Sequence, residues 1–398
     1  MKKTVIVDGL RTPFGKYKGA LKNIRPDDLA AIVIQNLVER NKISSMAIDD
    51  VILGCVNQAG EDNRNVARMS LLLAGLSEEI SGVTVNRLCG SGLEAVNQAT
   101  MQIETGRANL VVAGGVESMT RSPLVMLKPE FGFSRGNHTL ADSTLGWRFV
   151  NPRMNQLYPV VSLGESAEIM ADKFHISRND QDLFSYESHR KAANAELTGL
   201  FEKEIIPVYE MNSEKILLDK DEHVRKETTL EILAGLPPAF KKHGTVTAGN
   251  SSGINDGACV LLIMEEEFAI QNGYTPLAEI VTSAVVGVHP SLLGTGPIPS
   301  SLKALQRAGL RKEDIDLWEI SEAFASMTLS TVKELNLDLE KVNVNGGGIS
   351  IGHPLGASGA RMILSLVHEL RRRNLEYGLV TMCIGVGQGI ATIVKTYR

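Results

Sequence analysis

Cys89 stands in a setting that packing alone does not explain. The stretch TVNRLCGSGLEAV, residues 84–96, leads from a short apolar run through Cys89 into two glycines and then into apolar residues at helical spacing. We therefore predict that this cysteine occupies a tight turn between a strand and a helix. Unpaired N–H groups and partial positive charge at a helix N-terminus lower the pKa of a thiol and favour the reactive thiolate. The pattern indicates a nucleophile.

A histidine occupies a similar turn far along the chain. The segment NGGGISIGHPLGASGAR, residues 345–361, surrounds His353 with glycines, so the backbone there can approach a ligand closely, and a helix is expected to begin near Ala357. An isolated histidine is more often structural, but this turn mirrors the turn around Cys89. Imidazole can take the proton of a thiol and stabilise the thiolate, so the two residues make a sensible catalytic pair.

A second cysteine repeats the pattern of an apolar strand followed by glycines. In TMCIGVGQGIA, residues 381–391, Cys383 precedes three glycines, the first of which is Gly385. The alternative is a buried small hydrophobic residue. The glycines favour a second acid/base thiol beside exposed backbone donors. Cys55 and Cys259 lack this context, and we interpret both as core residues.

The elements that must position these turns form two similar sets. VTVNRLCGSGLEAV near residue 83 is echoed by VNVNGGGISIGHPLGASGARM near residue 342. In each half, a helical stretch also leads through an Asp-rich connection to a strand, at AIDDVILGCV and at DIDLWEISEAF. Two divergent copies of one α/β unit explain both echoes. Their packing about a pseudo-twofold axis would bring the turns of Cys89 and His353 together.

The composition between the copies predicts an insertion. Residues 121–246 contain loops, charged tracts and helical stretches around 165–200, whereas TVTAGNSSGINDGACVLLIM returns to a glycine-rich turn and an apolar strand. We therefore predict a first half at 1–120 and 247–270, a loop domain at 121–246, and a second half at 271–398.

The whole chain has the composition of a globular protein. Its 398 residues are 43% hydrophobic, and the net charge of −5 is spread without a long basic block, so neither nucleic acid nor an anionic membrane is an expected partner. No apolar run is long enough for a signal sequence or a membrane span, which predicts a cytoplasmic location. The four cysteines are scattered, which argues against both disulfides and a zinc site.

Taken together, the motifs resemble those of the thiolase family along nearly the whole chain. The resemblance implies an α/β fold of five αβαβα layers in two duplicated halves, with a loop domain over the active site. It also implies CoA thioesters as substrates, coenzyme A as a substrate rather than a permanent cofactor, no metal, and a homodimer or homotetramer. The matching segments are RTPFG at 11–15, NRLCGSG at 86–92, GGVESM at 114–119, TVTAGNSSGINDGA at 245–258, SEAF at 321–324, GHPLGASGAR at 352–361 and CIGVGQG at 383–389.

The resemblance also implies roles for the three catalytic candidates. Cys89 matches the acylated nucleophile, His353 the histidine that activates it and contacts the thioester oxygen, and Cys383 the general acid/base. The backbone N–H groups of Cys89 and Gly385 match an oxyanion hole.

The same resemblance implies a substrate tunnel. Ser252 and Arg225 match positions that contact the pantetheine and nucleotide ends of CoA, and Phe240 and Phe324 match apolar walls. For these four residues the alternative is an ordinary surface or core position. Leu163 stands where relatives often carry methionine.

Two features bear on the activity. Ser321 stands where many thiolases have an asparagine whose amide positions a water in the other oxyanion hole, and a hydroxyl can still hold a water. CIGVGQG, EDNRNVARMSLLLAG and GWRFVNPRM resemble degradative enzymes, including β-ketoadipyl-CoA thiolases. The resemblance thus predicts thiolytic cleavage of 3-ketoacyl-CoA through a Cys89 acyl-enzyme, in β-oxidation and fatty acid metabolism.

Three alternatives remain at this stage. The first is a biosynthetic acetyltransferase that forms acetoacetyl-CoA by the reverse reaction, which uses the same residues. The second is a weakly active homologue that binds acyl-CoA, for which Ser321 is the warning sign. The third is a decarboxylating ketoacyl synthase, and Cys383 argues against it because those enzymes use histidine or asparagine partners.

Overall fold

The computed structural model describes residues 2–133, 135–210 and 213–397. Its first half contains β1 (Thr4–Arg11), β2 (Gly15–Lys16), α1 (Pro26–Arg40), β3 (Asp50–Gly54), α2 (Val66–Leu73), β4 (Ser81–Val85), α3 (Ser91–Glu104), β5 (Leu110–Ser118), β10 (Asn255–Glu265) and α8 (Glu266–Gln271). Its second half contains β11 (Ala278–Gly287), α9 (Pro297–Ala308), β12 (Leu317–Ile320), α10 (Ala325–Leu335), α11 (Leu355–Arg373), β13 (Tyr377–Ile384) and β14 (Gln388–Thr396).

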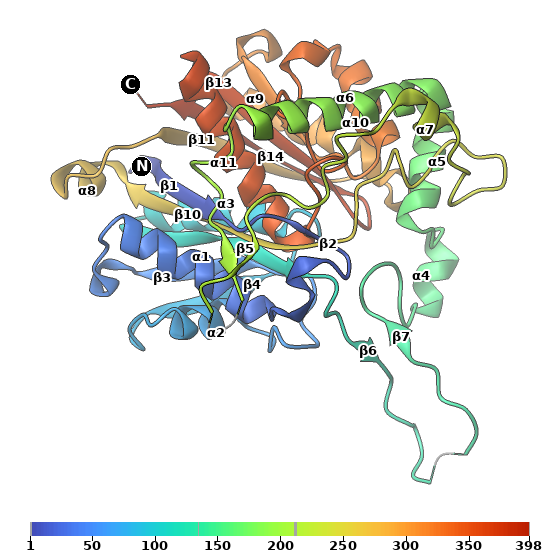
Figure 1. The fold of residues 1–398 in the computed structure, drawn as a ribbon, viewed down its shortest axis with the longest axis horizontal. Helices are drawn as coiled ribbons and strands as arrows, with labels where there is room; N and C mark the ends of the chain where they lie inside the picture. Colours follow the sequence, from blue (N-terminus) through green and yellow to red (C-terminus); the bar gives the residue numbers. More distant parts are fainter. Residues whose placement is uncertain (1, 134, 211–212, 398) are drawn as a thin grey trace.

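The inserted segment between β5 and β10 carries mostly helices and short strands. Its elements are β6 (Leu124–Val125), β7 (Ala141–Asp142), α4 (Pro152–Leu157), α5 (Leu163–Phe174), α6 (Arg178–Leu197), β8 (Val208–Tyr209), β9 (Ile216–Leu218) and α7 (Leu230–Ala234). The β6–β7 ribbon projects from the body of the molecule as an arm, whereas α5 and α6 lie against the second half (Figure 1).

The two halves repeat one topology. The strands follow the order β12-β13-β14-β11-β1-β10-β5-β3-β4, so β11, β14, β13 and β12 mirror β1, β10, β5 and β3 about the centre of the sheet. The halves meet in the sheet only at β1 and β11, where Val5 lies opposite Glu279 and Ile6 opposite Ala278. This symmetry confirms the duplication predicted from the sequence echoes.

Three layers of helices alternate with the two halves of the sheet. Helices α3 and α11 lie in the middle, where α11 contacts β5 and β10 on one side and β12 and β13 on the other (Figure 1). Helices α1 and α2 cover the outer face of the first half, and α9 and α10 that of the second. The five αβαβα layers are therefore as predicted, because each sheet face buries its apolar side chains against helices.

Glycines allow the two central helices to meet at their N-termini. A Cβ atom on Gly92 of α3 would lie 2.4 Å from the carbonyl oxygen of Gly356 in α11, and one on Gly115 of β5 would lie 2.0 Å from the same oxygen. Only glycine permits backbones to approach this closely. The turns that precede α3 and α11, which contain Cys89 and His353, are thereby brought to the same region.

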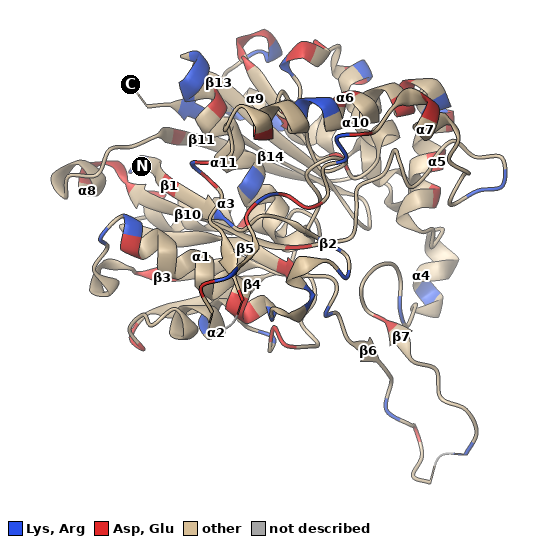
Figure 2. Ribbon diagram, in the orientation of Figure 1, with Lys and Arg blue, Asp and Glu red and all other residues tan. Residues whose placement is uncertain are grey.

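Basic and acidic positions are interspersed over both halves (Figure 2), in keeping with 41 basic and 46 acidic residues in the chain. Among the described residues, no helix combines the length and the apolar character that crossing a membrane requires.

Candidate active site

One cavity of about 830 Å³ contains the three catalytic candidates. Cys89, His353 and Cys383 line it from three different turns, although they are up to nearly three hundred residues apart in sequence. Six further residues singled out in the sequence also line it: Leu163, Arg225, Phe240, Ser252, Phe324 and Gly385. Ser321 does not. The long-range convergence follows from the duplicated fold, which places the N-termini of α3 and α11 together.

Cys89 lies in a constrained turn between β4 and α3. The preceding Leu88 has a φ of 48°, which is in the left-handed region that non-glycine residues seldom adopt. The Ser91 hydroxyl donates to the Leu88 carbonyl at 2.6 Å and accepts from the Arg87 N–H at 2.9 Å, which fixes the turn. The strand and helix flank the cysteine as the sequence predicts, and backbone strain of this kind is concentrated at functional sites.

The expected lowering of the Cys89 pKa is wrong for the free protein. Burial removes water from the thiolate and raises the pKa of Cys89 to about 12, and nearby Cys383 adds to the effect. The backbone N–H groups of Gly385 and Cys89 point toward the sulfur and oppose this increase, but burial outweighs them. Cys89 is therefore a neutral thiol at rest, and a base must take its proton before it can attack.

His353 has the tautomer and the charge state of such a base. Its Nδ1 lies 2.6 Å from the Ser358 hydroxyl oxygen, and that hydroxyl donates its only hydrogen to the Pro354 carbonyl at 2.8 Å. With the hydroxyl oriented in this way, Nδ1 carries the proton and donates to Ser358, which leaves a lone pair on Nε2. Nε2 is buried and has no hydrogen-bond partner in the described protein. Burial lowers the pKa of His353 to about 4, so the ring is neutral at physiological pH.

The backbone of His353 is held by a side chain of β10. Its N–H donates to the Asn255 side-chain oxygen at 2.9 Å, and the Asn255 amide donates to the Gly15 carbonyl at 3.0 Å. The preceding Gly352 has a φ of 113°, and a Cβ there would lie within 3 Å of the Asn255 amide. The histidine turn therefore depends on both a glycine and a residue from β10.

Cys383 ends β13 and is paired with Ser321, which follows β12. The Cys383 N–H donates to the Ser321 hydroxyl oxygen at 3.1 Å, and the Cys383 sulfur lies 3.5 Å from that oxygen. Burial raises the pKa of the Cys383 thiol, and the Ser321 hydroxyl opposes this increase. Ser321 thus faces Cys383 rather than the open cavity, and its expected water-holding role stays a prediction.

Two aromatic rings form one wall of the cavity. Phe240 and Phe324 pack edge to face with ring centroids 5.8 Å apart. Phe240 lies directly on Gly164, where a Cβ would come within 2.2 Å of the ring, and Leu163 begins the same helix. Arg225 places an exposed positive charge along the same cavity, whereas the nearby Lys16 pairs with Glu222 at 3.5 Å. An apolar channel with an exposed arginine at its border suits a long ligand that has phosphate groups at one end.

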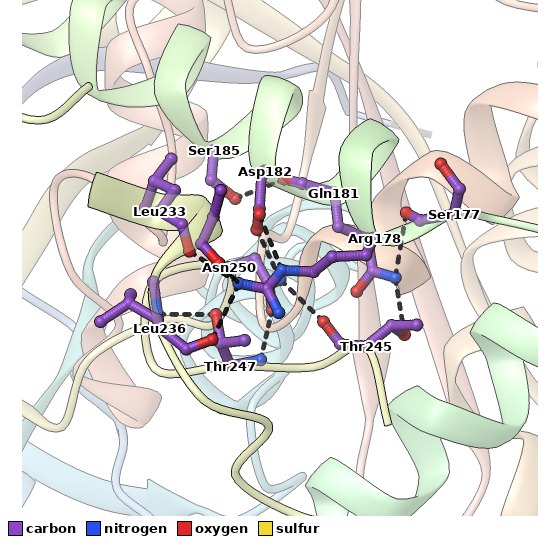
Figure 3. A network of polar contacts seen from close by, with 12 residues as sticks. Ser177, Arg178, Gln181, Asp182, Ser185, Leu233, Leu236, Thr245, Thr247 and Asn250 are labelled. Carbon is purple, nitrogen blue, oxygen red and sulfur yellow. Dashed lines mark hydrogen bonds and ion pairs between the residues drawn. The ribbon is translucent and has the colours of Figure 1, made fainter. Parts of the chain in front are cut away.

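A polar network holds the segment that supplies this wall (Figure 3). Arg178 pairs with Asp182 at 2.7 Å within α6 and donates to the carbonyls of Leu233 at 2.6 Å and Leu236 at 2.9 Å. Asp182 also accepts from the Asn250 amide at 3.0 Å. The inserted segment is thereby fastened to the chain that precedes β10, where Ser252 lines the cavity.

Sequence reasoning missed the side chains that support the catalytic residues. Glu117, at the end of β5, accepts hydrogen bonds from the N–H groups of Val56, Asn57 and Gly356, each at 3.0 Å. Burial raises its pKa to about 7. It lies within the motif GGVESM, which was the available signal. Ser358, whose hydroxyl contacts the His353 ring, lies within the motif GHPLGASGAR, which was likewise the available signal.

Other residues near the motifs take structural positions. Glu322, in the motif SEAF, does not line the cavity but is buried and accepts from Ser188 at 2.7 Å and Asn343 at 2.8 Å. Cys55 and Cys259 are buried in hydrophobic clusters, as predicted for core residues.

Two family models cover almost the whole chain. The model described as "Thiolase, N-terminal domain" matches residues 4–267, and "Thiolase, C-terminal domain" matches residues 274–396.

Known proteins with similar sequences and structures agree with these models. The chain is 52% identical over 400 residues to "3-oxoadipyl-CoA/3-oxo-5,6-dehydrosuberyl-CoA thiolase" of Escherichia coli K12, which covers 99% of this chain and 100% of that protein. It is 49% identical to a "Beta-ketoadipyl-CoA thiolase" of Acinetobacter baylyi, with the same coverage. Among solved structures, the Bacillus anthracis acetyl-CoA acetyltransferase superposes with a TM-score of 0.94 at 42% identity, covering 100% of this chain and 99% of that one. The human mitochondrial 3-ketoacyl-CoA thiolase in complex with CoA superposes with a TM-score of 0.92 at 39% identity, covering 100% and 98%.

Proposed function

The chain belongs to the thiolase family of acyltransferases, and from that we propose that it cleaves 3-oxoacyl-CoA with coenzyme A to give acetyl-CoA and a shortened acyl-CoA. The observation that carries the mechanism is that a neutral Cys89 thiol and an unpartnered His353 Nε2 share one cavity. Cys383 lines the same cavity and supplies a second proton.

The first half-reaction begins with proton transfer. His353 Nε2 takes the proton of Cys89, and the thiolate attacks the C3 carbonyl carbon of the substrate. The backbone N–H groups of Cys89 and Gly385, which already face the sulfur, stabilise the oxyanion that forms.

Carbon–carbon cleavage follows. The bond between C2 and C3 breaks, its electron pair forms the thioester enolate of the departing two-carbon unit, and the acyl group stays on Cys89. The Cys383 thiol protonates C2, which gives acetyl-CoA and a Cys383 thiolate. The protonated His353 donates from Nε2 to the enolate oxygen, and Ser358 holds its other nitrogen.

The second half-reaction returns both cysteines to their resting state. The Cys383 thiolate takes the proton of incoming CoA, and the CoA sulfur attacks the acyl carbon on Cys89. The Cys89 thiolate leaves and recovers its proton from His353. The reverse sequence condenses two acyl-CoA molecules, so metabolite levels set the direction.

The CoA moiety fits the main cavity. Phe240 and Phe324 provide apolar walls for pantetheine, and the exposed charge of Arg225 suits its phosphate groups. Ser252 lines the same cavity, with its N–H held by the Ala323 carbonyl at 2.9 Å. CoA acts as a substrate, and the absence of a permanent cofactor stays a prediction.

The names of the relatives support a narrower range of substrates than fatty acyl-CoA in general. The proteins from Escherichia coli and Acinetobacter baylyi are named for 3-oxoadipyl-CoA or β-ketoadipyl-CoA, whose acyl group ends in a carboxylate. We therefore place 3-oxoadipyl-CoA ahead of the β-oxidation intermediates expected from the sequence.

Two surfaces support an oligomer. β4 is an edge strand of the main sheet with Val83 40% exposed, which suits pairing with a second copy. The β6–β7 arm exposes Phe131 and Phe133, at 80% and 104%, which suits a further contact between copies (Figure 1). A homodimer or homotetramer is the proposal, and a monomer in sedimentation at micromolar concentration would contradict it.

The four cysteines are all unpaired and buried, which supports the predicted cytoplasmic, reducing compartment. A redox-sensitive fluorescent fusion that reports an oxidising location would contradict this.

The test of the reaction is direct. Incubation with 3-oxoadipyl-CoA and CoA should yield acetyl-CoA and succinyl-CoA in equal amounts, with acetoacetyl-CoA cleaved as a reference. Binding of CoA thioesters without turnover, or turnover of malonyl thioesters alone, would overturn the proposal.

A further inference from the structure

A smaller pocket adjoins the main cavity at Cys89. It measures about 220 Å³ and shares seven lining residues with the main cavity, among them Cys89, Leu163 and Gly385, but it contains none of Arg225, Ser252, Phe240 or Phe324. A group bonded to the Cys89 sulfur can extend into this pocket without following the CoA channel. We call it the acyl pocket.

The walls of this acyl pocket are mostly apolar. Its aliphatic and aromatic lining residues include Val56, Leu88, Trp147, Val161, Leu163 and Val386. Arg148 is the single charged side chain among the described residues that line it. An acyl chain with methylene groups near the sulfur and a negative charge at its end matches this arrangement.

Arg148 has no acidic partner of its own. Its side chain makes one weak contact, from Nη1 to the Ser143 carbonyl at 3.5 Å, and no carboxylate of the described chain forms an ion pair with it. Arg121, which also follows β5, pairs with Glu61 instead. The Arg148 guanidinium thus keeps its donors for a ligand, and its planar fork matches a carboxylate in a bidentate contact.

The segment that carries Arg148 is held against the catalytic half. The Ser143 hydroxyl accepts from the Asn57 amide at 2.9 Å and donates to the Pro123 carbonyl at 2.6 Å. The Trp147 indole N–H donates to the Val161 carbonyl at 2.9 Å. These contacts hold the segment just before Arg148 and place its exposed side chain at the border of the pocket.

We propose that Arg148 recognises the terminal carboxylate of the acyl group and so selects 3-oxodicarboxylyl-CoA over uncharged 3-oxoacyl-CoA of the same length. The proposal rests on the thiolase reaction proposed above, and it names the residue that sets the acyl preference. In 3-oxoadipyl-CoA only two methylene groups separate the carbonyl attacked by Cys89 from the terminal carboxylate. A short pocket with a cation at its edge suits that spacing.

The experiment compares two substrates of equal length, 3-oxoadipyl-CoA and 3-oxohexanoyl-CoA, which differ in a terminal carboxylate or methyl group. For Arg148→Gln we expect kcat/KM to fall about tenfold or more with 3-oxoadipyl-CoA and to stay level or rise with 3-oxohexanoyl-CoA, because a charge-assisted contact is lost only with the former. Arg148→Lys should recover part of the loss. The KM for free CoA should not change.

The matched control is Arg153→Gln. Arg153 is an exposed arginine of α4 that does not line the pocket, so its replacement should leave kcat/KM unchanged for both substrates. An equal loss with both substrates, or no loss with either, would overturn the role of Arg148. A parental protein that cleaves acetoacetyl-CoA but prefers 3-oxohexanoyl-CoA would overturn this inference alone. A parental protein that cleaves no 3-oxoacyl-CoA would instead overturn the proposed function.

Discussion

The Nδ1 atom of His353 lies 2.6 Å from the hydroxyl oxygen of Ser358, five residues further along the chain in the first turns of α11. Because the same hydroxyl donates to the Pro354 carbonyl, it can only accept from the ring. The helix that begins at this site therefore sets the tautomer of the histidine and directs the lone pair of Nε2 into the cavity. This relationship motivates the first prediction.

Replacing Ser358 with alanine should lower turnover without abolishing CoA binding. The loss of one hydrogen bond to a ring that becomes charged during the reaction should reduce kcat on the order of tenfold. The KM for CoA should change little. Ser365→Ala, which removes another buried hydroxyl from α11, is the matched control and should keep parental kcat. Equal effects of the two variants would show that Ser358 has only a structural role.

Cys89 should be the residue that carries the acyl group. After brief exposure to acetyl-CoA, the intact mass should increase by one acetyl group, and peptide mapping should place it on Cys89. The reason is that Cys89 has both backbone donors of Gly385 and Cys89 directed at its sulfur. A label on Cys383 or Cys55, or unimpaired thiolysis by Cys89→Ser, would refute the assignment.

Cys383 should matter more for carbon–carbon cleavage than for acylation. Cys383→Ala should still become acetylated from acetyl-CoA but should cleave acetoacetyl-CoA about 10² to 10⁴ times more slowly, the usual contribution of a positioned acid/base. The measurement is stopped-flow acylation beside steady-state thiolysis. If Cys383→Ala cleaved acetoacetyl-CoA at the parental rate, Cys383 would have no acid/base role.

Ser321→Ala should lower kcat and leave CoA binding nearly intact. The change leaves the buried N–H of Cys383 without its partner at 3.1 Å and removes the hydroxyl beside its sulfur. Removing a direct oxyanion donor costs on the order of 10² to 10³ in rate, and the indirect contact here should cost less. Ser330→Ala, which removes a buried hydroxyl of α10 that bonds only the Ser326 carbonyl, is the control.

Ser321→Asn distinguishes two explanations for the serine at position 321. A marked increase in thiolysis would indicate that serine is a compromise for the asparagine common in the family, and a decrease would indicate a pocket adapted to serine. If neither substitution alters thiolysis, residue 321 contributes nothing to either oxyanion hole.

The buried His353 should make stability fall in mild acid. Its pKa is about 4 in the folded protein and about 6.5 when unfolded, so between these values the unfolded chain binds a proton that the folded protein does not. The contribution of His353 to the free energy of unfolding is therefore fully present above pH 6.5. It decreases toward pH 4 by up to about 1.4 kcal/mol per pH unit.

His353→Asn should flatten that dependence. The measurement is urea unfolding at fixed protein concentration from pH 7 to 4, comparing the slopes of the two proteins. Acidic groups such as Glu117 are present in both proteins, so their contribution to the pH dependence of stability cancels when the two slopes are compared. Parallel slopes would mean that His353 titrates alike in the folded and unfolded states.

The sequence by itself determined the duplicated α/β plan and the three turns that carry the catalytic candidates. Both depend on local patterns, since Cys89, His353 and Cys383 each follow apolar residues and precede glycines that permit tight turns. The mirrored strand order and the five layers agree with those patterns. The choice of family rests on the same turns, because their chemistry requires particular residues at short spacing.

Only the tertiary structure decided the electrostatics and the supporting contacts. The sequence predicted a lowered thiol pKa from the helix N-terminus, but burial by distant segments raises the pKa of Cys89 to about 12. Asn255 holds the backbone of His353, Ser321 faces Cys383, and Arg148 borders the acyl pocket, although each is far in sequence from the residue or space it serves. Desolvation and long-range contacts depend on which segments surround a group, and that is set by the packing of the two halves and the inserted segment rather than by local sequence.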